Sequence, residues 1–79
     1  GHAPAQFLMG AMYREGWAVD RNYVEAYMWY SLAIPKAAQV LAVNRRYDPA
    51  QARDEVAAKM NKFQIAEAVA KAKAWRPGR

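Results

Sequence analysis

A gap of only five residues between two helical segments places the strongest limit on how this chain can fold. Apolar residues recur at helical spacing up to Gly16, and a second helical segment begins at Asn22. Gly16 can end the first helix because glycine adopts the left-handed C′ conformation without a steric clash, and Asn22 with Glu25 forms a capping box. Residues 17–21 are all that remains to connect the helices, so residues 5–33 are predicted to form an antiparallel hairpin.

The apolar pattern assigns an inner face to each helix of this hairpin. The predicted packing residues of the first helix are Ala5, Met9, Met12 and Tyr13. Those of the second helix are Tyr23, Ala26, Tyr30 and Ala33. Gly10 lies within the first stripe, where we expect another backbone to approach too closely for a side chain. Pro35 is expected to end the second helix, since the residue before a proline avoids helical geometry.

Two more helices are predicted in the second half of the chain. Asp48-Pro49 is an N-cap followed by proline at the first helical position, and Asn61 with Gln64 forms a second capping box. The expected buried residues of these helices are Ala52, Val56, Ala57 and Met60, then Ile65, Ala68, Val69, Ala72 and Trp75. Predicted outer ion pairs are Glu55–Lys59 and Glu67–Lys71. Residues 36–47 are predicted to be an irregular connection, with a short helical turn over 37–43.

Composition agrees with a single all-α domain spanning residues 1–79. Apolar residues make up 54% of the chain, Ala dominates them, and there are only four Gly and four Pro, which favours helices. The two halves differ in charge: residues 1–35 hold two basic and three acidic groups, whereas residues 36–79 hold ten basic and four acidic groups. The formal charge of +5 therefore belongs to the second half. No apolar run approaches the roughly 20 residues of a membrane span.

The residues needed for catalysis or metal binding are missing from the sequence. There is no cysteine, and His2 and Ser31 are the sole histidine and serine, so neither a nucleophile–base pair nor a zinc site can be assembled. Asp54 and Glu55 are adjacent on a predicted helix and point about 100° apart, as expected for a solvated face. No glycine-rich phosphate loop is present. We therefore predict a protein without catalytic activity, cofactor or metal.

The first hairpin also carries a recognisable motif. Its matching residues are Ala5, Gly10, Tyr13, Gly16, Val19, Tyr23, Ala26, Trp29, Tyr30 and Ala33. In this spacing they resemble the Sel-one-like repeat, a branch of the tetratricopeptide-type helical repeats, with the pattern A-x-x-x-L-G-x-x-Y-x-x-G-x-G-V and then D-Y-x-x-A-x-x-W-Y-x-x-A. Met9 stands where the pattern has Leu, Ala18 replaces the second Gly, and Asn22 replaces Asp.

The resemblance implies a scaffold or adaptor for protein partners, built as a right-handed superhelix of helix pairs. In these terms residues 5–35 are one repeat, residues 36–47 have no counterpart, and residues 48–76 are a degenerate C-terminal capping hairpin. The predicted fold is thus two antiparallel helical hairpins stacked as a short α–α superhelix, from the C-terminal part of a bacterial member. Gly1-His2 is typical of a cloning remnant, so a leader could lie upstream, and periplasm and cytoplasm both stay open.

One face of the first helix is the predicted partner-binding site. Phe7, Ala11 and Arg14 lie at i, i+4 and i+7 on a face that the packing stripe does not use, and an aromatic beside an arginine is typical of an interface hot spot. In the related repeats this face lines the concave groove. Trp17, in the connecting loop, is assigned to the same site. The other interpretation is that Phe7 packs on a preceding repeat, in which case the truncated end would favour self-association.

The basic second half supports an alternative from another class, binding to nucleic acid or another anionic surface through residues 45–76. Its candidate phosphate contacts are Arg45, Arg46, Lys59, Lys62, Lys71, Lys73 and Arg76. Tyr47 could stack on a base. Against this, the same cations alternate with Asp54, Glu55 and Glu67, as on an ordinary solvated surface.

Overall fold

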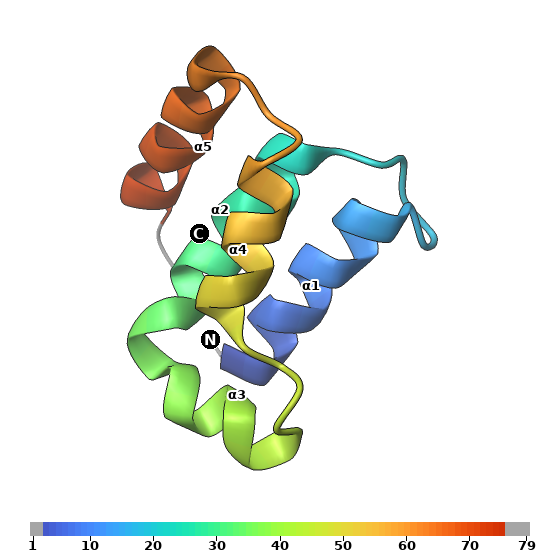
Figure 1. Ribbon diagram of the computed structural model, residues 1–79, viewed down its shortest axis with the longest axis vertical. Coiled ribbons are helices and arrows are strands. Elements are labelled where there is room, and N and C mark those ends of the chain that lie inside the picture. Colours follow the sequence, from blue (N-terminus) through green and yellow to red (C-terminus); the bar gives the residue numbers. More distant parts are fainter. Residues whose placement is uncertain (1–2, 76–79) are drawn as a thin grey trace.

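Helix α2 (Tyr23–Ala33) is the central element of the computed structural model (Figure 1). Three helices pack directly against it: α1 (Ala3–Glu15), α4 (Pro49–Ala57) and α5 (Lys62–Ala74). Helices α1 and α4 run parallel to each other and antiparallel to α2 (Figure 1). The predicted hairpin of the first two helices is therefore present.

The structure describes residues 3–75, and throughout this range the regular secondary structure is helical, without strands. The all-α prediction is confirmed. Gly1-His2, Arg76 and the predicted stop at Pro77-Gly78 lie outside the described residues. None of the helices described is long and apolar enough to cross a membrane.

The predicted starts of the last two helices are confirmed in detail. The Asp48 side chain accepts hydrogen bonds from the backbone N–H groups of Ala50 (3.1 Å) and Gln51 (3.3 Å). Asn61 Oδ1 accepts from the Gln64 N–H at 2.8 Å, and Gln64 Oε1 accepts from the Asn61 N–H at 2.9 Å. Because these bonds satisfy N–H groups that no helical turn can reach, both helices begin where the sequence places them.

The capping box predicted for α2 is only half formed. Asn22 Oδ1 accepts from the Glu25 N–H at 3.1 Å, as expected. The Glu25 carboxylate instead accepts from Lys71 Nζ at 2.8 Å, and the Asn22 N–H donates to the Tyr13 carbonyl at 2.9 Å. Glu25 therefore joins α5 to α2 because the backbone of α1 already satisfies the Asn22 N–H.

Two left-handed residues make the turn between α1 and α2. Gly16 has φ of 76°, and its N–H donates to the Met12 carbonyl at 2.7 Å, so the predicted glycine end of α1 is confirmed. Ala18 has φ of 62°, a conformation in which the Cβ of an L-residue crowds the following carbonyl oxygen. The chain thus holds an alanine where the Sel-one-like pattern has a second glycine.

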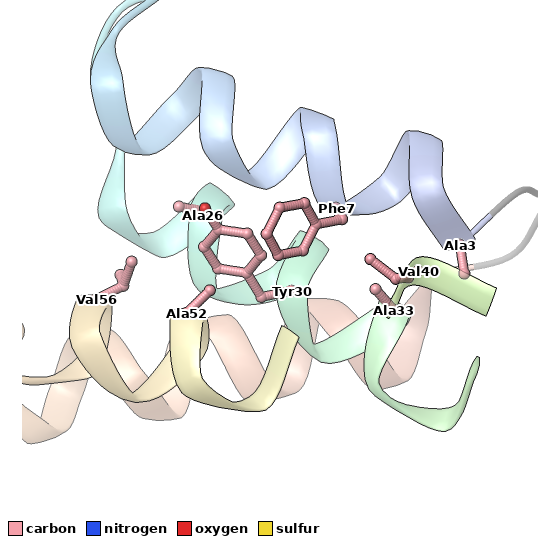
Figure 2. Packing of buried hydrophobic residues seen from close by; sticks show 8 residues of the cluster. All are labelled: Ala3, Phe7, Ala26, Tyr30, Ala33, Val40, Ala52 and Val56. Carbon is pink, nitrogen blue, oxygen red and sulfur yellow. The ribbon is translucent and has the colours of Figure 1, made fainter. Parts of the chain in front are cut away.

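Tyr30 is the centre of the hydrophobic core (Figure 2). Its side chain is fully buried, and the Phe7 ring lies 5.1 Å from it between centroids. A Cβ added at Gly10 would stand 2.7 Å from two ring carbons of Tyr30. Close approach at Gly10 is therefore confirmed, but the neighbour is an aromatic ring and not a second backbone. The other core residues drawn are Ala3, Ala26, Ala33, Val40, Ala52 and Val56.

The predicted inner face of the first helix is wrong. The buried residues of α1 are Ala3, Phe7, Gly10 and Ala11. Ala5 is exposed, and Met9, Met12 and Tyr13 are only half-buried. The helix is rotated relative to the expectation because Phe7, its largest apolar side chain, has aromatic neighbours on two sides, Tyr30 in α2 and Tyr47 in the connection that precedes α4.

The connection over residues 36–47 provides that second neighbour. A 3₁₀ turn (Ile34–Lys36) leads into α3 (Ala37–Val43), so the predicted short helical turn is confirmed. Val40 in α3 is fully buried, and the Tyr47 ring stacks on Phe7 at 4.7 Å with 20° between the planes. The connection therefore covers the first turns of α1.

Helices α4 and α5 are antiparallel but pack on α2 far more than on each other (Figure 1). Ala52, Val56 and Ala68 are buried as predicted, and the other predicted residues of these helices are half-buried. Neither predicted outer ion pair is formed, since Glu55–Lys59 and Glu67–Lys71 do not lie within ion-pair distance. Glu55 pairs with Arg14, and Lys71 pairs with Glu25. Lys59 lies beyond the end of α4 with its ammonium 5.8 Å from the centre of the Tyr23 ring.

Candidate protein-interaction groove

A groove of about 270 Å³ runs between the parallel helices α1 and α4. Its apolar lining comes from both helices, the α1–α2 turn and the connection before α4: Phe7, Leu8, Ala11, Trp17, Tyr47 and Ala52. Its polar lining consists of Arg14, Arg46, Asp48, Gln51 and Glu55. The groove exists because α1 and α4 each pack on α2 and leave a space between them above Tyr30.

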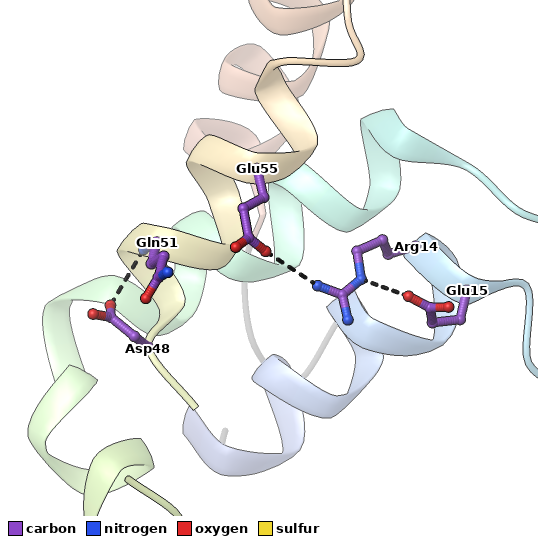
Figure 3. Close-up of polar contacts among 5 residues, drawn as sticks. All are labelled: Arg14, Glu15, Asp48, Gln51 and Glu55. Atoms are coloured by element: carbon purple, nitrogen blue, oxygen red, sulfur yellow. Dashed lines mark hydrogen bonds and ion pairs between the residues drawn. The ribbon is translucent and has the colours of Figure 1, made fainter. Parts of the chain in front are cut away.

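Arg14 connects the two walls near the C-terminal end of α1 (Figure 3). Its Nε atom lies 2.9 Å from Glu15 Oε2, and its Nη1 atom lies 3.7 Å from Glu55 Oε1 in α4. All three side chains are partly exposed, so solvent screens these pairs and each contributes little to stability. Their effect is to hold the guanidinium in place at the side of the groove.

A hydrogen-bonded turn forms the opposite end of the groove, next to the start of α4. Asn44 Oδ1 accepts from the Arg46 N–H at 2.9 Å, and the Asn44 carbonyl accepts from the Tyr47 N–H at 2.9 Å. Together with the Tyr47–Phe7 stack, these bonds fix the backbone from which Arg46 extends. Asp48 then caps α4 (Figure 3).

Exposed apolar side chains gather at this groove. Within residues 3–75 the exposed large apolar residues are Leu8, Trp17, Val43 and Phe63, and two of these four line the groove. Leu8 is 47% exposed and Trp17 is 59% exposed. An apolar lining with a polar rim is typical of a surface that contacts another molecule.

The structure brings all four predicted partner-binding residues together in the lining of the groove. Their roles differ from the expectation, however. Phe7 and Ala11 are 7% and 8% exposed and form its floor, so the prediction that they lie on a face unused by packing is wrong. Phe7 also requires no preceding repeat, because Tyr30 and Tyr47 already cover it. Arg14 is partly exposed and Trp17 is exposed, as the prediction requires.

Leu8 and the α4 residues that line the groove were not predicted from the sequence. Leu8 precedes Ala11 by three residues and so shares its face of α1, a spacing that was available in the sequence. Glu55 and Gln51 were not predictable as groove residues, since their relation to α1 depends on how α4 packs. Arg46 and Tyr47 were assigned to an anionic surface instead.

Several basic residues of that alternative surface are engaged within the protein. Lys71 is bound to Glu25, and that hydrogen bond raises the pKa of its ammonium group above the usual value. The Lys59 and Lys62 ammonium groups lie 5.8 Å and 5.4 Å from the ring centres of Tyr23 and Phe63. Tyr47 already stacks on Phe7. These cations lie on several elements, and Arg76 is outside the described residues.

A buried tyrosine side chain packs against Phe7 in the floor of the groove. The Tyr30 hydroxyl has no hydrogen-bond partner among residues 3–75, and burial raises its pKa, so it stays protonated near neutral pH. Within the same residues no group of three or more His, Cys, Asp or Glu side chains is placed to hold a metal ion.

No protein-family model, curated protein or solved structure matches the chain in comparisons with known proteins.

Proposed function

We propose that this protein is a protein–protein interaction module that holds a segment of a partner in the groove between α1 and α4 and performs no catalysis. The observation that carries the proposal is the joint lining of this groove by Leu8, Arg14 and Trp17, two exposed apolar side chains and a positioned cation. Aromatic residues and arginine are enriched at the energetic centres of interfaces.

We further propose that the chain belongs to the Sel-one-like type of helical repeat. The support is local: Gly10 against Tyr30, the left-handed residues at 16 and 18, and the buried Ala26 and Ala33 fall at the motif positions. The parallel course of α1 and α4, each followed by an antiparallel helix, is what two stacked hairpins of a superhelix would have. On this basis the groove is the inner surface of the stack.

The alternative of an anionic ligand bound through residues 45–76 has less support. Phosphate binding needs cations that are free and gathered on one face. Lys71 is bound to Glu25, and Tyr47 is stacked on Phe7.

The proposal is tested by selecting phage-displayed random peptides on the intact chain and measuring the affinity of the selected peptides by fluorescence anisotropy. Trp17→Ala should weaken binding about tenfold, as expected for loss of an aromatic hot spot of about 1.4 kcal/mol. Leu8→Ala should act in the same direction. Neither change should unfold the protein, since both side chains are exposed.

Phe63→Ala is the matched control, because Phe63 is 74% exposed on α5 and does not line the groove. It should leave peptide affinity unchanged. Selection of no peptide at all, or equal losses for Trp17→Ala and Phe63→Ala, would contradict the proposed function.

A further inference from the structure

The size of the groove limits what it can hold. At about 270 Å³ it is smaller than the roughly 300–1,000 Å³ typical of sites for cofactors and drug-sized ligands. It is partly open to solvent, and its lining includes the exposed side chains of Leu8 and Trp17, which suits one or two side chains of a peptide and not an enclosed small molecule.

The acidic side chains of the groove are already engaged by the protein. Asp48 accepts two backbone hydrogen bonds at the N-terminus of α4, where the helix dipole also stabilises its negative charge. Glu55 faces the Arg14 guanidinium at 3.7 Å, and Arg14 is held by Glu15 as well. Arg14 and the three carboxylates carry a net charge of −2, but each carboxylate already has a partner within the protein, so none of them is left unpartnered for a ligand.

Arg46 differs from every other charged residue of the groove. Within residues 3–75 no carboxylate lies at ion-pair distance from its guanidinium. Its backbone is nevertheless held in place by the Asn44 turn and by Tyr47 stacked on Phe7. The Arg46 side chain is exposed, so its guanidinium can pair with the carboxylate of a ligand through two parallel hydrogen bonds.

We infer that the groove selects a peptide segment that carries a bulky apolar side chain and, to one side of it, an acidic residue. The apolar side chain packs against Leu8 and Trp17, and the carboxylate pairs with Arg46. This inference rests on the proposed function and adds the chemistry of the partner. The positive charge of Arg46 attracts an acidic residue of the peptide and repels a basic residue at the same position.

The test uses three short fluorescein-labelled peptides in fluorescence anisotropy with the intact chain. The first has a Gly/Ser backbone with one Trp and two Asp, the second replaces both Asp by Lys, and the third keeps Asp but replaces Trp by Ala. The first should bind at least about tenfold more tightly than either of the others, which corresponds to about 1.4 kcal/mol. Its advantage over the second should shrink as salt is raised.

Reversing the charge of Arg46 provides the decisive comparison. Arg46→Glu should invert the preference, so that the Lys peptide binds more tightly than the Asp peptide. Arg45→Glu is the matched control: it makes the same charge change one residue away on an exposed side chain that does not line the groove, and the preference for Asp should persist.

The outcomes separate this inference from the function on which it rests. Binding that depends on Trp17 but is equal or stronger for the Lys peptide would overturn the acidic preference and leave the interaction groove intact. Equal effects of Arg46→Glu and Arg45→Glu would also overturn the assignment to Arg46. If none of these peptides nor any phage-selected peptide bound in a way that Trp17→Ala weakens, both the inference and the proposed function would fail.

Discussion

Helices α1 and α5 have the same length, thirteen residues, and both pack on α2, yet they are attached to it in different ways. Helix α1 buries four residues and seats Gly10 directly on the Tyr30 ring. Helix α5 buries only Ala68. Its apolar residues Ile65, Val69 and Ala72 are only half-buried. Two further links to α2 lie at the periphery: the Lys71–Glu25 ion pair and, from the C-cap, the edge contact of Trp75 with Trp29 at 5.9 Å.

The difference shows that similar Ala-rich helices can be attached either by close steric packing or by a few scattered contacts. A closely packed contact has no room for an additional atom, because protein interiors are packed as densely as organic crystals. A contact made at the edges of a helix tolerates substitution, since solvent can replace each link. We therefore expect mutations on the α1 side to have large effects and those on the α5 side to have small ones.

The largest effect should come from Tyr30→Ala. Removing a fully buried aromatic ring costs about 3–5 kcal/mol, which approaches the whole free energy of unfolding of roughly 4–12 kcal/mol for a chain of this length. Ile65→Ala on α5 removes a half-buried side chain and should cost about 1 kcal/mol. Urea denaturation followed by circular dichroism measures both, and equal losses would abolish the distinction between the two helices.

Gly10→Ala should destabilise the protein by about 1–2 kcal/mol, because the overpacking penalty exceeds the gain of about 1 kcal/mol in helix propensity. The new Cβ would meet ring carbons of Tyr30 at 2.7 Å, and that ring is buried and has little room to move. Ala5→Gly, at an exposed position of the same helix, is the control and should lose about 1 kcal/mol. A stabilising Gly10→Ala would mean that α1 is held no more tightly than α5.

Ala18→Gly should stabilise the protein by about 0.5–1 kcal/mol. Relief of the left-handed strain of an L-residue, about 1–2 kcal/mol, is partly offset by the greater freedom of glycine in the unfolded chain. Gly16→Ala introduces the same strain at φ of 76° and should destabilise by about 1 kcal/mol. Thermal unfolding of both variants checks the signs. A loss of stability in Ala18→Gly would contradict the turn described here.

Lys71→Gln should cost about 0.2–1 kcal/mol, the range of partly exposed ion pairs. The difference from the wild type should shrink in about 1 M salt, where the screening length is about 3 Å. Lys62→Gln removes the same charge from α5 without breaking an ion pair and should change stability less. A loss as large as that of Gly10→Ala would show that the peripheral contacts of α5 are stronger than the comparison assumes.

Tyr30→Phe should have the smallest effect near neutral pH, within about 0.5 kcal/mol, because the hydroxyl it removes makes no hydrogen bond among the described residues. The two proteins should diverge above pH 10. Burial raises the pKa of Tyr30 above 10.0, so the unfolded chain loses the phenolic proton first. The free energy of unfolding of the wild type therefore falls as pH rises through this range, whereas the Tyr30→Phe variant lacks this contribution.

Lys71 acts in the same direction, since its pKa is also raised and the stability it contributes is lost at alkaline pH. It is retained in the Tyr30→Phe variant, so the difference between the two unfolding curves isolates Tyr30. Parallel curves from pH 8 to pH 11 would contradict the assignment.

Much of the local structure was predictable. The caps at Asn22, Asp48 and Asn61 and the end of α1 at Gly16 are at the predicted residues, because each depends on hydrogen bonds or backbone angles within a few residues. The inward face of α2 was predictable in large part: Ala26, Tyr30 and Ala33 are buried as predicted, whereas Tyr23 is half-buried and the buried Met28 was not predicted.

The face of α1 and the pairing of charges were not predictable from the sequence. Phe7 is buried because Tyr47, forty residues later in the chain, stacks on its ring. The charged side chains of Glu25, Glu55 and Lys71 form ion pairs with residues of other helices. Helical periodicity identifies which residues share a face, but it does not specify what each face meets.

The sequence by itself determined where α2, α4 and α5 begin, where α1 ends, and that α1 must fold back on α2, because capping and short-loop geometry act over a few neighbouring residues. The tertiary structure alone decided which side of α1 is buried and that a groove opens between α1 and α4. Those features arise from packing between segments distant in the chain, where the fit of one ring against one glycine selects the arrangement.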